Sequence, residues 1–185
     1  MLDPIFADAE QRMKKSIELL RHQLAGIRAS RASPGLIEHV EVNYYGTPTP
    51  LNQLATITAP EPRTLLVQPW DRNAVSAIEK ALRASDLGLN PSTDGQLIRI
   101  NLPPLTEERR RSLVKLVREQ VEETKVAIRN VRRDALTHVK DLLRNKQIGE
   151  DDERRAAERL QELTNRFIAD ADRVGKQKEH DILEV

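Results

Sequence analysis

Arginine and lysine side chains recur along one edge of the segment between residues 106 and 150. This segment carries 12 basic and 8 acidic residues. If it is a helix, with about 100° of rotation per residue, a set of its basic residues lies within about 60° of Arg129. Among them are Arg111, Arg118, Lys125, Arg132, Arg133, Lys140 and Arg144. Between residues 111 and 144, the acidic residues Glu119, Glu123, Asp134 and Asp141 lie about 80–140° away, and only Glu122 interrupts the basic edge.

An arginine-rich edge of this kind is suited to binding phosphate. The planar guanidinium group binds phosphate through two hydrogen bonds and keeps its charge. No aromatic residues alternate with these cations, which disfavours recognition of single strands by base stacking. The pattern therefore favours contact with the backbone of a folded RNA. The alternative is a solvated helix face stabilised by ion pairs between residues four apart, as in coiled coils, and periodicity alone slightly favours it.

Signals of catalysis are nearly absent from the sequence. The four histidines, at positions 22, 39, 138 and 180, show no metal-ligand spacing, and Gly88 and Gly95 are not followed by the Lys-Ser/Thr pair of a phosphate-binding loop. The absence of cysteine excludes disulfides, thiolate metal sites and a cysteine nucleophile. We expect no enzymatic activity, no metal and no cofactor.

The overall composition limits the class of protein. Of the 185 residues, 32% are charged, yet the formal net charge is only +1, which argues against a uniformly basic surface. A hydrophobic fraction of 38% with only 3% aromatic residues predicts an aliphatic core, which suits helix packing. The first ten residues do not resemble a secretory leader, and no segment approaches the about 18 apolar residues of a membrane span. We expect a cytoplasmic protein that does not contact membranes.

Composition also divides the chain. Residues 31–105 contain nine of the ten prolines and only 13 charged residues, whereas the flanks are rich in charge. Long solvated helices are typical of such flanks, and short strands joined by turns are typical of the middle. We predict an α+β protein of two domains, in which a helical domain of residues 1–30 and 106–185 is interrupted by an inserted domain of residues 31–105.

The flanks predict three long helices. The first begins at Asp3-Pro4, presents the apolar stripe Ile5, Ala9, Met13, Ile17, Leu20, Leu24 and Ile27, and ends before Ser33-Pro34. The second starts after Thr106 as N-cap and runs to about Gln147, about 40 residues or 60 Å. The third follows Gly149 and presents Ala156, Leu160, Leu163, Phe167, Ala171 and Val174. A short connection makes it antiparallel to the second, and together they predict a three-helix bundle.

The insertion predicts a small domain of a few strands and one helix. Residues 39–44, 54–58, 64–68 and 96–102 have strand character, residues 46–50 predict a turn, and Asp71 is an N-cap for a short helix that Gly88 closes. The chain passes between the two domains twice, at about residues 30–34 and 102–105, which predicts a two-stranded hinge. Its residues are Ser30, Arg31, Ser33, Pro34, Pro103, Pro104 and Leu105.

Five stretches of the sequence closely resemble the bacterial ribosome recycling factor family. They are RASRASPGL (28–36), VNYYGTPTPLNQLATI (42–57), SDLGLNP (85–91), LPPLTEERR (102–110) and IRNVRRDA (128–135), and they follow the family order along essentially the whole chain. The resemblance implies a three-helix bundle joined by a flexible hinge to a β/α/β sandwich, in an L-shaped, tRNA-like outline. It also implies a monomer that performs no covalent chemistry itself.

The resemblance further implies binding to the large ribosomal subunit after termination. With elongation factor G and GTP, the factor would split the ribosome into subunits and release mRNA and tRNA for new initiation. By matching motif, Arg110, Arg129, Arg132 and Arg133 are implied rRNA contacts, with Arg28 and Arg31 as further candidates; Arg118 and Lys125 join them from the basic edge. The family hinge commonly has Gly where this chain has Ser30, so either the backbone freedom of glycine is not needed here or this hinge is stiffer. The other class of function that the sequence allows is a coiled-coil scaffold that binds proteins.

Overall fold

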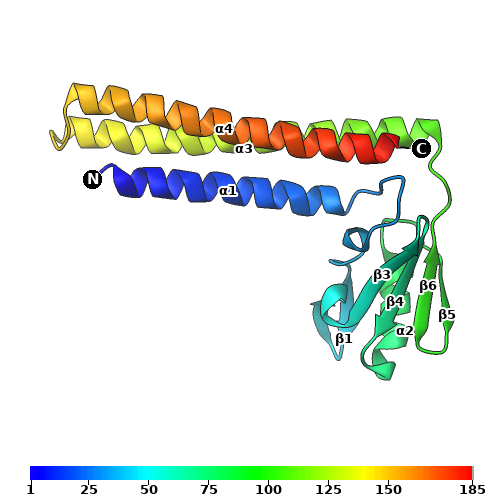
Figure 1. The fold of residues 1–185 in the computed structure, drawn as a ribbon. Coiled ribbons are helices and arrows are strands. Elements are labelled where there is room, and N and C mark those ends of the chain that lie inside the picture. Colours follow the sequence, from blue (N-terminus) through cyan, green and yellow to red (C-terminus); the bar gives the residue numbers. More distant parts are fainter. Residues whose placement is uncertain (185) are drawn as a thin grey trace. The chain divides into compact units, whose positions relative to one another are not determined.

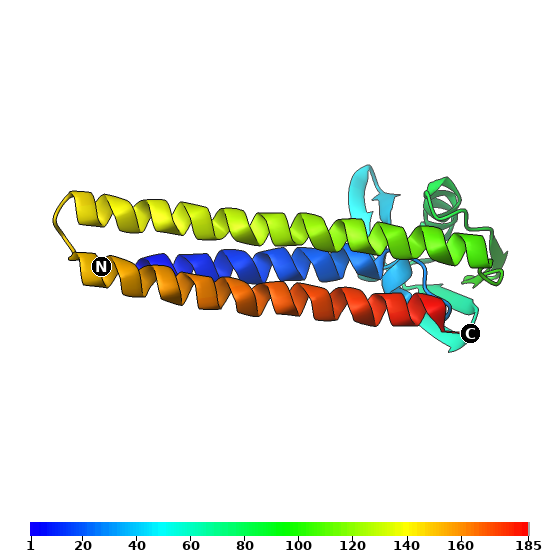
Figure 2. The same cartoon turned by 90° about the horizontal axis from the view of Figure 1, so that it is seen from above.

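Three long helices account for most of the chain, in a computed structural model that describes residues 1–184. Helix α1 spans Asp3–Ala25, α3 Glu107–Arg144 and α4 Glu150–Leu183. The three run side by side in both views, with α3 antiparallel to α1 and α4 (Figure 1, Figure 2). The predicted α+β class with a three-helix bundle is confirmed. Helix α1 ends well before the Ser33-Pro34 signal, because Gly26 follows it and glycine is costly inside a helix.

The contacts between residues divide the chain into two compact units, each described here by itself. Among the described residues, the helical unit comprises residues 1–24 and 114–179, and the mixed unit comprises residues 25–113 and 180–184. The ends of α3 and α4 that adjoin the inserted segment thus belong to the mixed unit. The boundaries predicted at residues 30/31 and 105/106 remain a prediction.

The core of the helical unit is aliphatic, as the composition indicates. Helix α3 buries Val114, Val117, Val121, Thr124, Ile128 and Val131, which alternate at steps of three and four residues. This spacing is typical of helices that pack along a coiled-coil seam. Helix α1 buries Phe6, Ala9, Met13, Ile17, Leu20 and Leu24, and α4 buries Ala156, Leu160, Thr164, Phe167 and Ala171.

Gly175 lies at a close approach between α4 and α3. A Cβ atom at this position would lie 2.5 Å from Cγ2 of Val121, well inside van der Waals contact. Val121 cannot easily move away, because a β-branched side chain has one strongly preferred rotamer in a helix. The missing side chain at Gly175 therefore sets the spacing of the two helices.

The mixed unit contains two small antiparallel sheets. Strands β3 (Ala55–Glu61), β4 (Thr64–Pro69), β6 (Leu97–Asn101) and β5 (Pro91–Asp94) form one sheet in that order. Strands β1 (Glu41–Tyr44) and β2 (Thr47–Pro50) form the other. Helix α2 (Val75–Ala84) packs against β1 and β5, and short 3-10 turns cover Pro34–Leu36, Leu51–Gln53 and Arg72–Ala74. Strands β1, β3, β4 and β6, helix α2 and the three 3-10 turns contribute to one apolar core, which includes Val42, Leu51, Leu65, Val67, Ile78, Leu82, Ile98 and Ile100.

Two local predictions for the insertion were wrong. Residues 47–50, expected to be part of a turn, form β2, and the turn is confined to Tyr45 and Gly46, which have positive φ angles of 50° and 82°. Pro48 and Pro50 fit this strand because alternate N–H groups of an edge strand point away from its partner. Helix α2 ends at Ala84 with Ser85 as its C-cap, ahead of Gly88.

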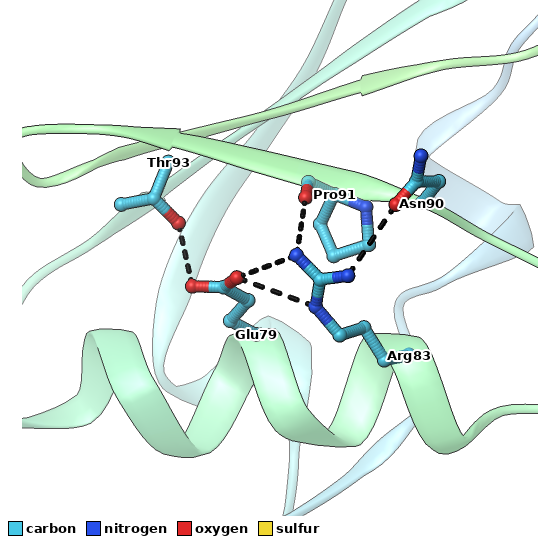
Figure 3. Close-up of polar contacts among 5 residues, drawn as sticks. All are labelled: Glu79, Arg83, Asn90, Pro91 and Thr93. Atoms are coloured by element: carbon cyan, nitrogen blue, oxygen red, sulfur yellow. Dashed lines mark hydrogen bonds and ion pairs between the residues drawn. The ribbon is translucent and has the colours of Figure 1, made fainter.

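A polar network joins α2 to β5 (Figure 3). Arg83 Nη2 and Thr93 Oγ1 donate to the two carboxylate oxygens of Glu79, at 2.8 Å and 2.7 Å. Arg83 also donates to the carbonyl of Pro91 at 3.1 Å and, more weakly, to Asn90 Oδ1. The hydrogen bond from Arg83, followed by that from Thr93, lowers the pKa of the Glu79 carboxyl. The network fixes a short edge strand to the helix beside it.

A second bond, from Tyr44 to Asp71, joins β1 to the turn before α2. The Tyr44 hydroxyl donates to Asp71 Oδ2 at 2.7 Å, while Asp71 Oδ1 accepts from the backbone N–H of Asn73. The hydrogen bond to Asp71 is the main cause that raises the pKa of Tyr44 to about 12, followed by burial and by the charge of Asp71. The neighbouring Tyr45 and Trp70 are largely exposed.

We predict that Gly175→Ala lowers the free energy of unfolding by about 1–3 kcal/mol, the usual cost of an added methyl group in a packed seam. Urea unfolding monitored by circular dichroism measures this. Val121→Ala is the matched background, because it removes the atom that the new Cβ would meet. If Gly175→Ala were equally destabilising in that background, the close approach of the two helices would not be the cause.

We predict that Tyr44 ionises with a midpoint of about pH 12, and that Asp71→Asn shifts this midpoint downward. The folded pKa lies above the ordinary value of about 10, so the stability contributed by this bond is complete below about pH 10 and is lost as the pH rises through the folded pKa. Tyrosinate absorbance in a Tyr45→Phe background isolates Tyr44, with circular dichroism confirming that the chain stays folded. Equal midpoints with and without Asp71→Asn would contradict this role of the carboxylate.

Candidate nucleic-acid interface

Helix α3 carries most of the predicted RNA contacts, and its start is fixed locally. The Oγ1 atom of Thr106 accepts a hydrogen bond from the backbone N–H of Arg109 at 3.1 Å, as the N-cap prediction requires. The negative charges of Glu107 and Glu108 in the first turn interact favourably with the helix dipole. From there the helix is unbroken to Arg144, so one rigid element positions the basic residues.

Two residues of the predicted basic edge are paired with carboxylates of α4. Arg118 Nε lies 2.5 Å from Glu179 Oε1, and Lys125 Nζ lies 2.6 Å from Asp172 Oδ1. The Lys125 side chain is only 17% exposed, whereas that of Arg118 is 73% exposed. The two pairs lie on either side of Gly175, along a groove of about 360 Å³. These two pairs join α3 to α4, so they differ from the alternative of ion pairs between residues four apart on one helix, but they likewise offset the charges of Arg118 and Lys125.

Three arginines one turn further along α3 are arranged differently. Arg129 and Arg132 are half-buried and Arg133 is exposed. None of them forms an ion pair within residues 1–184. Arg132 Nη1 donates to the side-chain oxygen of Gln161 on α4, and Arg133 Nη1 donates to Asn130 Oδ1 at 3.3 Å. Arg132 and Arg133 therefore combine a hydrogen-bonded side chain with a charge that no carboxylate offsets, a combination suited to phosphate recognition, and Arg129 adds a third such charge beside them.

Arg28, Arg31 and Arg110 lie in the mixed unit. Arg28 Nη2 donates to the carbonyl of Pro103, which joins the two predicted hinge strands. The Nε atoms of Arg28 and Arg110 are buried and have no acceptor among the described residues. Arg31 is exposed, with a guanidinium nitrogen 3.8 Å from Glu184.

Two basic residues that the sequence analysis did not select approach Arg28. Burial, followed by the charges of Arg63 and Arg109, lowers the pKa of the Arg28 guanidinium. Neither Arg63 nor Arg109 forms an ion pair within the described part of the chain. Arg63 comes from the β3–β4 turn, and only the folded sheet shows that this turn meets the hinge strand. Arg109 could have been predicted from the sequence, because it belongs to the same LPPLTEERR stretch as Arg110.

The first segment of the predicted hinge is hydrogen-bonded to the end of α4. Ser30 donates its backbone N–H to the carbonyl of Asp181 at 3.2 Å and its hydroxyl to the carbonyl of Ile182 at 2.7 Å. A glycine at position 30 could not make the second of these bonds. The serine therefore adds a restraint that the glycine common in the family pattern would lack.

Both hinge strands are also bonded to the β3–β4 turn. The backbone N–H of Ala32 donates to the carbonyl of Pro62 at 2.6 Å, and that of Leu102 donates to the carbonyl of Arg63 at 2.7 Å. The predicted hinge residues Ser33, Pro34, Pro103, Pro104 and Leu105 lie next to these bonds in the chain and belong to the mixed unit. The two connections between the helices and the sheets thus meet at one turn.

Residues 1–184 show neither a metal site nor a membrane span. No group of three or more histidine, cysteine, aspartate or glutamate residues there is arranged to hold a metal ion. No helix in this part of the chain has both the length and the apolar character of a membrane span. The arginines of α3 and of the hinge remain the candidate functional residues.

Comparisons with known proteins agree on one family. A family model described as ribosome recycling factor matches residues 20–183. A ribosome-recycling factor of Thermomicrobium roseum is 77% identical over 185 residues, covering all of both chains. One from Thermus thermophilus is 53% identical over 182 residues, covering 98% of each chain.

Two solved structures resemble the whole chain. One is a solution structure of a ribosome recycling factor, with a TM-score of 0.80, 47% identity, and coverage of 100% of this chain and 98% of the other. The other is a model of the T. thermophilus ribosome recycling factor and the E. coli elongation factor G bound to the E. coli post-termination complex. It matches with a TM-score of 0.71 and 53% identity over the full length of both chains.

Proposed function

Because this chain belongs to the ribosome recycling factor family, we propose that it acts on the ribosome after termination. It binds the large subunit and, together with elongation factor G and GTP, separates the subunits and releases mRNA and tRNA for new initiation. The full-length similarity to a factor described together with elongation factor G on a post-termination complex supports this role. The observation that carries the binding step is the set of arginines on α3 without a carboxylate partner.

Arg129, Arg132 and Arg133 are the principal rRNA contacts in this proposal. They lie within about one turn of a rigid helix, where their spacing suits neighbouring phosphates. Arg28, Arg31 and Arg110 extend the contact in the mixed unit, and Arg63 and Arg109 add positive charge near Arg28. Arg118 and Lys125 have a secondary role, because the carboxylates of Glu179 and Asp172 offset their charge.

The hinge supplies the movement in this proposal. Elongation factor G pushes the inserted domain, the chain bends at residues 30–34 and 102–105, and the bundle is driven against contacts that bridge the subunits. Two chain crossings restrict the movement to a bend or swivel. The Ser30 hydroxyl bond to Ile182 makes one crossing stiffer.

We predict that post-termination ribosomes release free subunits only when this protein, elongation factor G and GTP are all present. Sedimentation through a sucrose gradient measures the release. Omission of each component in turn is the control. Subunit release without this protein, or no release with all three, would refute the recycling role, and binding to non-ribosomal proteins alone would favour the scaffold alternative.

In the same assay, Ser30→Gly tests the hinge, with Ser33→Gly as the matched control, because Ser33 makes no side-chain capping bond. We expect Ser30→Gly to change the rate of splitting and to speed hydrogen exchange of the neighbouring backbone amides, since it removes the bond to Ile182 and adds backbone freedom. Equal rates and equal exchange in the two variants would show that the hinge does not depend on this restraint.

We predict that Arg133→Gln weakens binding to purified large subunits about tenfold, the loss of one charge-assisted hydrogen bond, and lowers the salt slope of binding by about one. Arg118→Gln is the matched control: the same substitution on the same helix removes a charge that Glu179 already offsets. Filter binding at several salt concentrations measures both. Equal effects of the two substitutions would contradict the assignment of the unpaired arginines as the RNA-binding set.

A further inference from the structure

Three cations of α3 reach across to α4 at intervals of seven residues. They are Arg118, Lys125 and Arg132, and each lies one position after a buried valine or threonine of the seam. This is the flanking position from which coiled-coil helices form bonds to their neighbours. The three residues therefore occupy equivalent places along the α3–α4 seam.

Their partners on α4 are chemically different. Glu179 and Asp172 are carboxylates, which offset the charges of Arg118 and Lys125 at hydrogen-bond distance. The partner of Arg132 is Gln161, whose side-chain oxygen accepts a hydrogen bond from Nη1 without carrying a net charge. Among the described residues no carboxylate lies within ion-pair distance of Arg132. Arg132 is held like the other two and keeps its full charge.

The Gln161 amide is itself held in one orientation. Its nitrogen donates to Asn165 Oδ1 at 2.8 Å, one turn further along α4, while its oxygen faces Arg132. A guanidinium group has only donors, so a flipped amide would place a donor against a donor. Asn165 therefore keeps the accepting oxygen of Gln161 turned toward α3.

These contacts also determine which atoms of Arg132 remain available. The guanidinium has five N–H donors. Gln161 uses one of the donors on Nη1, and Nε is buried without an acceptor in the described part of the chain. The three remaining N–H groups belong to the two terminal nitrogens, and this end of the fork can bind a phosphate through two bonds.

We propose that Gln161 is a positioning residue for RNA binding: it fixes the Arg132 guanidinium at the seam through a neutral bond and leaves its charge for a phosphate of the RNA backbone. This inference rests on the proposed function, in which Arg132 contacts rRNA. A carboxylate at position 161 would hold the guanidinium equally well but would compete with the phosphate. A side chain without a hydrogen-bond acceptor at position 161 would not offset the charge of Arg132, but it would no longer hold the guanidinium in place.

The test uses the full chain and purified large subunits, with binding measured over a range of salt concentrations. Gln161→Glu is expected to weaken binding about tenfold and to lower the salt slope by about one, because it neutralises one cation. Gln161→Met is expected to weaken binding several-fold with an unchanged salt slope, because the charge persists but is no longer oriented. In both variants the unfolding midpoint in urea stays within error of the parent or rises. A purely structural role would lower that midpoint and leave the salt slope of Gln161→Glu unchanged.

Gln147→Glu is the matched control, because it makes the same substitution at an exposed position between α3 and α4, fifteen residues along the chain from Arg132. An equal loss of affinity in Gln147→Glu and Gln161→Glu would overturn the proposal in favour of a general charge effect. Arg132→Gln distinguishes the RNA contact of Arg132 from the positioning role of Gln161. If it changes affinity and salt slope while Gln161→Glu changes neither, the positioning role is wrong and the RNA contact stands. If Arg132→Gln itself changes nothing, the contact assigned to Arg132 is wrong.

Discussion

Burial of one aliphatic stripe on each of three helices is the constraint on which the rest of the structure depends. No helix of the bundle could stay folded alone, because its stability comes from packing and each buried aliphatic side chain contributes only about 1.5–3 kcal/mol. The seam of α3 repeats at steps of three and four residues from Val114 to Val131, and Gly175 allows α4 to lie close to it. Once these side chains interlock, the helices cannot slide past each other, and every polar residue beside the seam acquires a fixed neighbour.

This register determines which charges remain available. Helix α3 carries more basic than acidic residues and α4 more acidic than basic ones, so the near-neutral total hides a local imbalance. Where a carboxylate of α4 faces a cation, as at Asp172 and Lys125, the charge stabilises the bundle. Where an amide faces it, as at Gln161 and Arg132, the charge is retained. The apolar seam and the proposed RNA-binding edge are therefore two results of the same helix packing.

The sequence alone was sufficient to predict features that depend on residues close together along the chain. The N-cap at Thr106 and the apolar stripes could be predicted because caps and helical periodicity are local. The sequence was insufficient where a distant segment decides the outcome. A helical wheel assigns Arg118 and Arg132 to one face but does not identify the residues of α4 that oppose them, and so it grouped a paired cation with an unpaired one. Residues 47–50 resembled a turn because of Pro48 and Pro50, and only pairing with β1 shows that they form a strand.

The prolines of β2 have a consequence for the behaviour of the protein in solution. Strand β2 pairs with β1 along one side only, and its other side is an edge of a two-stranded sheet. An exposed edge ordinarily offers backbone donors to which another chain can add a strand, the first step of β-aggregation. Pro48 and Pro50 lie opposite Asn43 and Glu41, and their nitrogens, which carry no hydrogen, fall on the side away from β1. The β2 edge of the small sheet is thus protected from the addition of a strand from another chain.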